Sequence, residues 1–390
     1  MNTNYKMLAK TMHGLEPILA RELRNLGAAH VKEGIRNVTF EGDKGFMYKA
    51  NMALRTAIRI LKPYKSFKVR NEQDLYDQIQ KIHWEEFLFT DKTFAINSTV
   101  SNSTFTHSHY VSLKTKDAIV DYFRDKYGKR PSIDLKHPDL YINIHIQNNQ
   151  CTVSFDSSGE SLHKRGYRDR TNIAPINEAL AAGLILLAGY DGTQNLIDPM
   201  CGSGTILIEA AMIAVNFPPN LNRNEFAFEK WSDFDVDLFE KIQDSLIAKI
   251  RDTSAKIVGY DKAPSAVKKA QDNIKNADFS EFVTVEKQDF FTSTHPFEGE
   301  KTLVLFNPPY GERLQVDIPV FYSKIGDTLK QGYSGVDAWL ITSDFQHGLK
   351  KVGLRTSKKI QLYNGALECR FVKYEMYRGT RKQKNDERVN

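Results

Sequence analysis

The chain of 390 residues has little of what disulfide-rich, zinc-binding and membrane proteins require. Its only cysteines are Cys151, Cys201 and Cys369, which lie far apart and form no Cys-x-x-Cys pair. This scarcity argues against a disulfide framework and a cysteine-based zinc site, and it fits a reducing, cytosolic compartment. No apolar run approaches membrane-spanning length, and the first ten residues contain no apolar signal core.

A strong charge of either sign is also lacking. The formal net charge is +6 and the isoelectric point is about 8.9. This mild basic excess is compatible with an anionic partner but is weak support for one by itself. The histidine pair in "HSHY" (107–110) has no further ligands nearby in the sequence, so we predict a loop before a helix there and no metal site.

Before about residue 160, short helices and strands interleave as in small α+β units. The periodicity predicts helices at 14–27, 45–57, 74–88 and 110–128, strands at 37–42, 59–69 and 93–103, and a hairpin over 140–159 that turns at Asn148 and Asn149.

Beyond "HKRGYRDR" (163–170), strands alternate with longer helices, as in a doubly wound α/β sheet. The apolar runs predict strands at 194–198, 255–261, 283–289, 301–307 and 337–344, with a closing hairpin over 358–377.

The segment "LIDPMCGSGTILIEAAMIA" (196–214) combines a strand, a tight glycine-containing turn and a helix. Gly202 and Gly204 permit backbone conformations and close approaches that a Cβ would block. No Gly-Lys-Ser/Thr follows, and position 207 is Leu, so neither a P-loop nor a full dinucleotide fingerprint is present. Asp198 would repel phosphate but attract an amine, while the helix N-terminus favours an anion. A ligand with an amine and a carboxylate, such as the methionine part of S-adenosylmethionine, suits both.

Two later strands also end in acidic residues. Asp261 is placed to accept hydrogen bonds from ribose hydroxyls, and Asp289 from an adenine amino group, with Phe290 as a stacking wall. The residues that we predict to contact the cofactor are Asp198, Pro199, Cys201, Gly202, Ser203, Gly204, Thr205, Asp261, Lys262, Asp289 and Phe290, together with Asn177 and Glu178 at the start of the preceding helix.

The strand "KTLVLF" (301–306) runs directly into "NPPY" (307–310). The two prolines end the strand and form a stiff corner at its carboxyl end. An exocyclic base amine is a poor nucleophile, and two acceptors aimed at its protons, the side-chain oxygen of Asn307 and the carbonyl of Pro308, favour its rehybridisation. Tyr310 offers a ring on which the target base can stack. This chemistry requires no strong general base.

With these residues in view, the second half resembles the class I S-adenosylmethionine-dependent methyltransferases of the Asn-Pro-Pro-Tyr type, which methylate amino groups of adenine, guanine or glutamine. More narrowly, nearly the whole chain resembles the THUMP-domain RNA methyltransferases, and among them the bacterial group that acts on guanine N2 of large-subunit ribosomal RNA. The narrower resemblance rests on "HKRGYRDR", "APINEALAAGLILLAGY", "DPMCGSGTILIEAA", "FAFEKW" and "FNPPYGERL".

The resemblance implies an α/β fold with three parts: a ferredoxin-like α+β region at 1–60, a THUMP RNA-binding domain at 61–160 and a seven-stranded Rossmann-like methyltransferase domain at 161–390. It also implies S-adenosylmethionine as cofactor, RNA as partner, a cytoplasmic location, and a catalytic corner made of Asn307, Pro308, Pro309 and Tyr310. In "HKRGYRDR", the residues that we predict to contact RNA are Lys164, Arg165, Tyr167, Arg168 and Arg170, although a solvated linker is an alternative.

Asp198 and Asp261 stand 63 positions apart (198 to 261), whereas a simple strand–helix–strand unit needs about 30. The family carries an insertion there, here "NFPPNLNRNEFAFEKWSDF" (216–234). The sequence leaves open whether this insertion shapes the substrate entrance or only pads the fold.

Three other functions remain open at this point. The Asn-Pro-Pro-Tyr corner does not distinguish guanine N2 from adenine N6, so adenine methylation of DNA or RNA is an alternative. Transfer RNA is a second possible substrate. A non-catalytic RNA-binding or ribosome-assembly protein is a third reading, disfavoured because the acidic strand ends and the glycine loop are intact.

Overall fold

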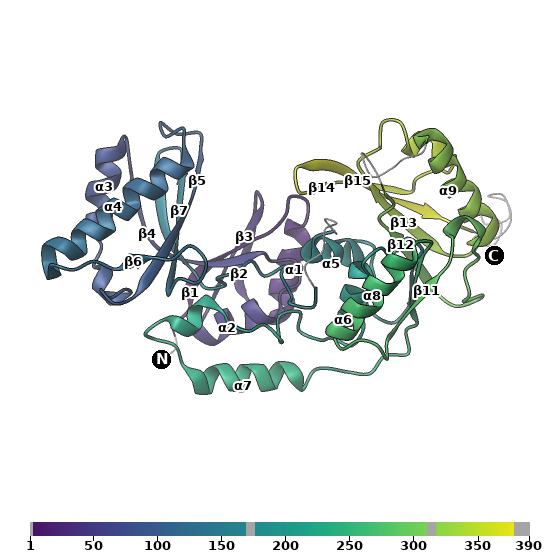
Figure 1. Ribbon diagram of the computed structural model, residues 1–390, viewed down its shortest axis with the longest axis horizontal. Coiled ribbons are helices and arrows are strands. Elements are labelled where there is room, and N and C mark those ends of the chain that lie inside the picture. The colour runs from purple at the N-terminus through teal and green to yellow at the C-terminus, as the bar shows by residue number, and fades with distance from the viewer. Residues whose placement is uncertain (1–2, 169–175, 310–316, 378–390) are drawn as a thin grey trace. The chain divides into compact units, whose positions relative to one another are not determined.

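The computed structural model describes residues 3–168, 176–309 and 317–377 (Figure 1). Contacts divide the chain into two compact units. Unit 1 consists of residues 1–11, 20–162 and 223–244, and unit 2 consists of residues 12–19, 163–222 and 245–390. Each unit therefore contains a short segment that is distant in sequence from the rest of it.

Unit 1 contains an eight-stranded sheet in the order β2-β3-β1-β4-β8-β7-β5-β6. Its first elements are β1 (Tyr5–Lys10), α1 (Glu16–Leu26), β2 (Ala29–Gly34), β3 (Asn37–Gly42), α2 (Lys44–Ala53) and β4 (Arg59–Lys68). The remaining elements are α3 (Glu72–Gln80), η1 (Trp84–Glu86), β5 (Thr93–Ser101), α4 (Ser108–Tyr127), β6 (Ser132–Ile133), β7 (Leu140–Gln147) and β8 (Gln150–Asp156). The hairpin turn at Asn148 and Asn149 lies where the sequence predicts it, and both residues have positive φ.

The predicted helix at 74–88 is interrupted. Helix α3 ends at Gln80, and a short 3₁₀ turn follows at η1. Trp84 is fully buried, and its indole N–H donates to the carbonyl of Ile79 at 2.9 Å. This bond satisfies a carbonyl at the helix end, so the chain turns inward instead of continuing the helix.

Unit 2 contains a seven-stranded sheet in the order β11-β10-β9-β12-β13-β15-β14. The strands are β9 (Asn195–Asp198), β10 (Ile257–Asp261), β11 (Val283–Lys287), β12 (Thr302–Phe306), β13 (Asp337–Thr342), β14 (Lys358–Asn364) and β15 (Leu367–Glu375). The first five are parallel to one another, and β15 runs antiparallel to both β13 and β14. The predicted α/β architecture with a seven-stranded sheet is confirmed.

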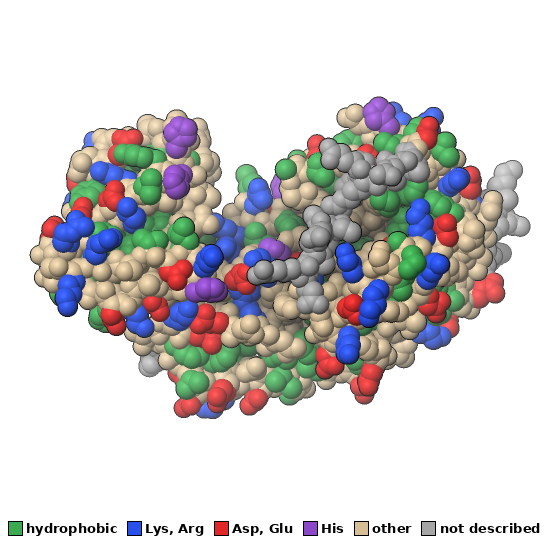
Figure 2. All heavy atoms as spheres, in the orientation of Figure 1, with side chains coloured by type: hydrophobic (Ala, Val, Ile, Leu, Met, Phe, Trp, Pro, Cys, Tyr) green, Lys and Arg blue, Asp and Glu red, His purple; other side chains and the backbone are tan. Residues whose placement is uncertain are grey.

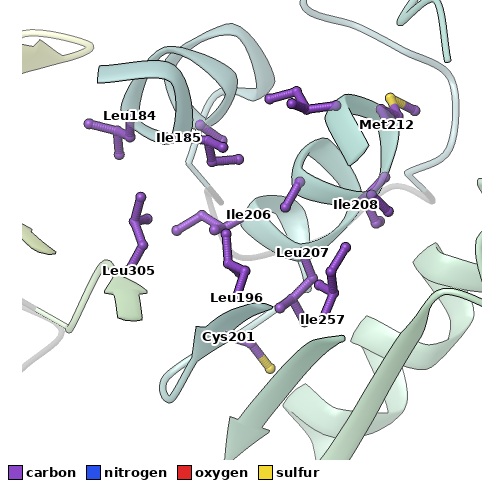
Figure 3. Close-up of a cluster of buried hydrophobic side chains, with 14 of the residues drawn as sticks. Leu184, Ile185, Leu196, Cys201, Ile206, Leu207, Ile208, Met212, Ile257 and Leu305 are labelled. Atoms are coloured by element: carbon purple, nitrogen blue, oxygen red, sulfur yellow. The ribbon is translucent and has the colours of Figure 1, made fainter. Parts of the chain in front are cut away.

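Helices cover both faces of this sheet, because its central strands are apolar on both sides. In β12, Leu303 and Leu305 belong to the core shared with α5 (Glu178–Leu187), α6 (Thr205–Ala214) and α8 (Pro264–Asn276). Val304 and Phe306 belong to the opposite core, with α9 (Ile318–Gly332). Figure 3 shows the first core, where Ile206 and Leu207 of α6 point toward the strands that carry Leu196 and Ile257.

The insertion after α6 forms η2 (Ala227–Lys230) and α7 (Val236–Ile247). Most of it, residues 223–244, packs with unit 1 although its sequence neighbours on both sides belong to unit 2. Phe228 stacks on Tyr48 with ring centroids 4.5 Å apart, and its backbone N–H donates to the carbonyl of Ser157. The insertion is therefore a structural part of unit 1 and not loose padding.

Over the described residues, no helix combines the length and the apolar character that crossing a membrane requires.

Candidate functional site

A pocket of about 340 Å³ lies in unit 2 at the carboxyl ends of the parallel strands. Residues from the ends of β9, β10, β11 and β12 line it, and Phe321 from α9 adds to one wall. Ligands of open α/β sheets bind at this edge, where the strand order reverses between neighbouring strands.

The glycine loop between β9 and α6 forms one wall of the pocket. Gly202 and Gly204 both have positive φ, at 53° and 78°. A Cβ on Gly204 would meet the Cβ of Ala270 at 3.2 Å, whereas a Cβ on Gly202 would meet nothing within 4 Å. A side chain at position 204 would therefore crowd α8, whereas an added Cβ at Gly202, which lines the pocket, would enter open space.

Asp198 ends β9 and is 1% exposed. Its Oδ1 accepts from the backbone N–H of Met200 at 3.1 Å. Burial, with a smaller contribution from the charge of Asp261, raises the pKa of Asp198 well above its usual value. Among the described residues no cation pairs with it, so a cationic group entering the pocket would stabilise its charged form.

Asp261 and Asp289 stand at the ends of the next two strands. Asp261 accepts from the N–H groups of Gly202 (3.1 Å) and Ala263 (2.9 Å), one at each carboxylate oxygen. A carboxylate has about four acceptor sites, so Asp261 can accept further bonds from a ligand. Asp289 uses one oxygen to accept from Phe291 N–H at 3.0 Å, and Phe290 beside it is also on the pocket wall.

Asn307, Pro308 and Pro309 line the pocket at the end of β12. The side-chain oxygen of Asn307 is buried and accepts no hydrogen bond from any described residue. Such an orphaned acceptor is costly unless a ligand donates to it. Tyr310 lies outside the described residues.

Asn177 and Glu178 lie beside the pocket but are not on its wall. Asn177 caps α5 by accepting from Ala179 and Leu180. Glu178 is buried and pairs with Arg168 at 3.2 Å, and burial raises the pKa of Glu178 to about 6. The side chain of Asn177 is used in capping, whereas Oε2 of Glu178 has no hydrogen-bond partner among the described residues. Asn177 and Glu178 therefore stay predictions as cofactor contacts.

The "HKRGYRDR" segment is mostly buried where the structure describes it. Arg165 pairs with Glu209 of α6 at 3.4 Å, and both side chains are fully buried. The hydroxyl of Tyr167 donates to the same carboxylate at 3.3 Å. This burial removes Arg165 and Tyr167 from any surface that RNA could contact, contrary to our prediction.

Arg168 is partly buried and connects this segment to the pocket. Its guanidinium donates to the carbonyl of Ile176 and the hydroxyl of Thr205, both at 2.6 Å, and these two residues line the pocket. Lys164 is exposed, and Arg170 lies outside the described residues. On the face shown in Figure 2, Lys and Arg side chains are interspersed with Asp and Glu, in keeping with the small net charge.

Several wall residues have no local signal in the sequence. Phe321 comes from a helix beyond the proline corner and contacts Phe291 edge-on at 5.4 Å. The other unpredicted wall residues are Ile176, Met200, Ile206, Ala263, Ser265, Ala266, Lys269 and Phe291. Most of them neighbour a predicted residue in sequence and would be found by extending each motif by one helical turn.

Cys201 also lines the pocket. Burial, together with the nearby carboxylates of Asp198 and Asp261, raises the pKa of its thiol well above the ordinary value. The thiol is therefore neutral and unsuited to nucleophilic attack. Across the described ranges, no group of three or more metal-ligating side chains occurs.

Family models match three successive stretches of the chain. The model described as "RMKL-like, methyltransferase domain" matches residues 165–373, the THUMP domain model matches 69–156, and the RlmL ferredoxin-like domain model matches 6–61.

Two relatives align with nearly all of the chain. A Synechocystis sp. protein named as an RNA methyltransferase is 39% identical and covers 96% of this chain and 98% of its own length. A Syntrophotalea carbinolica protein named ribosomal RNA large subunit methyltransferase K/L is 36% identical over 96% of this chain. The chain spans only about half, 54%, of that second relative.

Two solved structures share the fold over nearly the whole chain. The crystal structure of SMU.472, described as a methyltransferase complexed with SAH, is 29% identical with a TM-score of 0.85, and covers 97% of this chain and 100% of its own. A structure from Listeria monocytogenes, described as a predicted N6-adenine-specific DNA methylase, is 28% identical with a TM-score of 0.84, and covers 95% and 96% of the two chains.

Proposed function

The chain belongs to the RMKL-like methyltransferase family, and from this premise we propose that it transfers a methyl group from S-adenosylmethionine to the N2 amino group of a guanine in RNA, with 23S ribosomal RNA as the leading substrate. The protein is an S-adenosylmethionine-dependent methyltransferase. The choice of guanine, of its N2 atom and of ribosomal RNA belongs to the proposal.

The pocket residues fit S-adenosylmethionine. Asp198 would hold the amine, because a buried carboxylate without a cation gains from a positive partner. The loop around Gly202 would receive the carboxylate at the start of α6, and Asp261 would accept from the ribose hydroxyls. Asp289 and Phe290 would face the adenine. When bound, the cofactor supplies a methyl group on a positively charged sulfur.

The observation that carries the proposal is the buried side-chain oxygen of Asn307 on the wall of this pocket, which has no hydrogen-bond partner in the described part of the chain. This oxygen and the Pro308 carbonyl would accept the two protons of an exocyclic amine. Accepting them turns the amine's lone pair away from the ring and raises its nucleophilicity, and the prolines hold both acceptors in place beforehand. The proton that the nitrogen loses after transfer passes to solvent.

RNA is proposed as the substrate class because of unit 1 and the relatives' names. The THUMP domain model matches most of the predicted THUMP domain at 61–160. The other two models match within the predicted ferredoxin-like region at 1–60, extending one residue past it, and within the predicted methyltransferase domain at 161–390. We propose those three divisions as the functional modules. We also propose Lys164 as a remaining RNA contact and the cytoplasm as the location. The K/L relative is named for large-subunit ribosomal RNA, which makes that RNA the first to test.

Adenine N6 is the second candidate. The Listeria protein of similar fold is named for adenine in DNA, and the Asn307 corner accepts protons from either base. Transfer RNA methylation and a purely binding role in ribosome assembly are the further alternatives. The unpartnered Asn307 oxygen argues against a purely binding role, because binding alone gives no reason to leave it unsatisfied.

The test uses the full chain, S-adenosylmethionine carrying a labelled methyl group, and total ribosomal or transfer RNA from cells that lack the gene. Labelled nucleosides are then identified by mass spectrometry. We expect N2-methylguanosine from the large-subunit RNA. Labelled N6-methyladenosine in its place would overturn the guanine assignment, and label confined to transfer RNA would overturn the ribosomal one.

A further inference from the structure

A second unpartnered acceptor lies one strand away from Asn307. Strands β12 and β13 are parallel neighbours, with Phe306 opposite Leu340. Asn307 follows β12 directly, and Asp344 follows β13 after one intervening residue. Oδ2 of Asp344 is buried and, within the part of the chain that the structure describes, has no hydrogen-bond partner.

The strand order places Asp344 on the side of β12 that faces away from the cofactor pocket strands β9, β10 and β11. Strand β12 lies between β9 and β13, and the cofactor pocket is lined from β9, β10, β11 and β12. Asp344 is not on the wall of that pocket. In the sheet, β13 flanks β12 on the side away from β9, β10 and β11, and this is the side on which a base bound at Asn307 has room outside the cofactor pocket.

Asp344 is also held in place by its surroundings. Its backbone N–H donates to the hydroxyl of Thr342 at 2.9 Å, and that hydroxyl bonds the buried hydroxyl of Tyr322 on α9. Its carbonyl accepts from Gly348 N–H at 2.8 Å. A Cβ on Gly348 would meet the Tyr322 ring at 2.6 Å, so this loop closes tightly against α9. These bonds fix the backbone from which the Asp344 carboxylate projects, and a fixed backbone lowers the entropy cost of recognition.

We propose that Asp344 is a specificity-determining residue that selects guanine by accepting a hydrogen bond from its N1–H. This inference rests on the proposed function and names the part of the base that the site reads. Guanine presents adjacent N1–H and N2–H donors, which suit a carboxylate beside an amide oxygen. Adenine presents an acceptor at N1, so a carboxylate there would repel it and would remain unsatisfied.

The experiment compares two RNA fragments that contain the mapped target position, one with guanine and one with 2-aminopurine. 2-Aminopurine keeps the N2 amine but has an acceptor at N1. We expect the native protein to prefer guanine by about tenfold or more in kcat/KM. Asp344→Asn offers an amide N–H to the N1 acceptor, so it should reduce that preference about tenfold while leaving S-adenosylmethionine affinity unchanged.

The matched control is Asp327→Asn on the exposed side of α9, which should keep the native preference. Asp344→Ser is a second variant, for use if Asp344→Asn fails to fold. Its hydroxyl can donate or accept a hydrogen bond, so it should also reduce the preference for guanine over 2-aminopurine. A preference that neither Asp344 variant changes overturns this inference while N2-methylguanosine remains the product. If the native protein produces N6-methyladenosine, the proposed function falls first and this inference falls with it.

Discussion

At the scale of single residues, the side-chain oxygen of Asn307 accepts no hydrogen bond from the residues that the structure describes, and Asn307 lies on the pocket wall. We expect Asn307→Ala to bind S-adenosylmethionine normally and to lose turnover by about 10²-fold, since a preorganised polar contact to the reacting group is removed. Calorimetry measures the first quantity and methyl incorporation the second. Asn307→Asp keeps an acceptor oxygen and should retain much more activity than Asn307→Ala. Full turnover in the alanine variant would contradict the role given to this oxygen.

The pKa of Asp198 gives a prediction about pH. Burial and Asp261 raise this pKa in the free protein, and a bound amine would lower it again. Cofactor binding should therefore release a proton from Asp198. Below the raised pKa, the affinity should fall about tenfold for each unit of decreasing pH.

The measurement is calorimetry of S-adenosylhomocysteine binding between about pH 5 and 7, where the ligand amine stays charged. Two buffers that differ in ionisation enthalpy report the number of protons released. Asp198→Asn should bind more weakly and release none. The same variant should stabilise the free protein, because a carboxyl whose pKa is raised on folding lowers stability at pH values above its unfolded pKa of about 3.8. Proton release that is the same in both proteins would refute this assignment.

Single-residue exposure was the least predictable property of the site. The motif "HKRGYRDR" is basic and aromatic, which favours RNA contact, yet Arg165 and Tyr167 are buried against Glu209. The sequence did contain one sign of this. Glu209 is the only charged residue in the otherwise apolar helix "TILIEAAMIA", and a buried carboxylate needs a partner from elsewhere in the chain.

At the scale of elements, a glycine-to-alanine substitution in the loop between β9 and α6 can reduce either stability or cofactor affinity, depending on its position. Gly202→Ala and Gly204→Ala both place an alanine at positive φ, which costs about 1–2 kcal/mol. Only the Gly204 methyl also presses on Ala270, so Gly204→Ala should unfold at the lower temperature. The Gly202 methyl projects into open space at the pocket, so Gly202→Ala should lose cofactor affinity by at least about tenfold.

Gly299→Ala is the matched control for the loop. Gly299 has φ of 82° and nothing within 4 Å of an added Cβ, but it does not line the pocket. It should lower stability and leave cofactor affinity unchanged. Thermal unfolding and calorimetry on the three variants provide the comparison. If Gly202→Ala binds the cofactor as well as Gly299→Ala does, the loop does not approach the ligand closely.

Elements of unit 2 could be predicted well, because apolar strands that end in Asp or Asn mark the carboxyl edge of a parallel sheet. The predicted strands at 194–198, 283–289 and 301–307 overlap β9, β11 and β12 closely. Elements that depend on distant contacts were missed or misjudged. The helix predicted over 74–88 stops at Gln80 because Trp84 turns into a core, and the two-residue β6 exists only through pairing with β5.

At the scale of the whole molecule, the resemblance to THUMP-domain methyltransferases is confirmed by three family models in the expected order. What neither motif nor family pattern indicated is the exchange of segments between the units. Residues 12–19 pack with unit 2, where a Cβ on Gly183 of α5 would meet Leu15 at 2.6 Å. Residues 223–244 pack with unit 1. Each unit therefore needs chain that its sequence neighbours do not supply.

The aromatic cluster that the insertion brings to unit 1 makes this dependence testable. Phe228 is fully buried and stacks on Tyr48, and its ring centroid lies 5.7 Å from that of Phe239. Phe228→Ala should cost about 3–5 kcal/mol, as for other buried aromatic residues. Because the cavity forms within unit 1, the loss of protection from hydrogen exchange should appear in α2 and β3 and spare β12 and β13, and the cofactor should still bind.

Val236→Ala removes apolar atoms from the same insertion at a side chain that is 52% exposed, so it should change stability by no more than about 0.5 kcal/mol. Two results would contradict the assignment of the insertion to the core of unit 1. One is a loss of hydrogen-exchange protection that appears first in the unit 2 strands of Phe228→Ala, and the other is a free energy of unfolding of Phe228→Ala equal to that of Val236→Ala. The expected pattern would mean that residues 1–11 and 20–162 complete their core only when the insertion is present. A cut at the apparent domain boundary would then separate unit 1 from part of its own core.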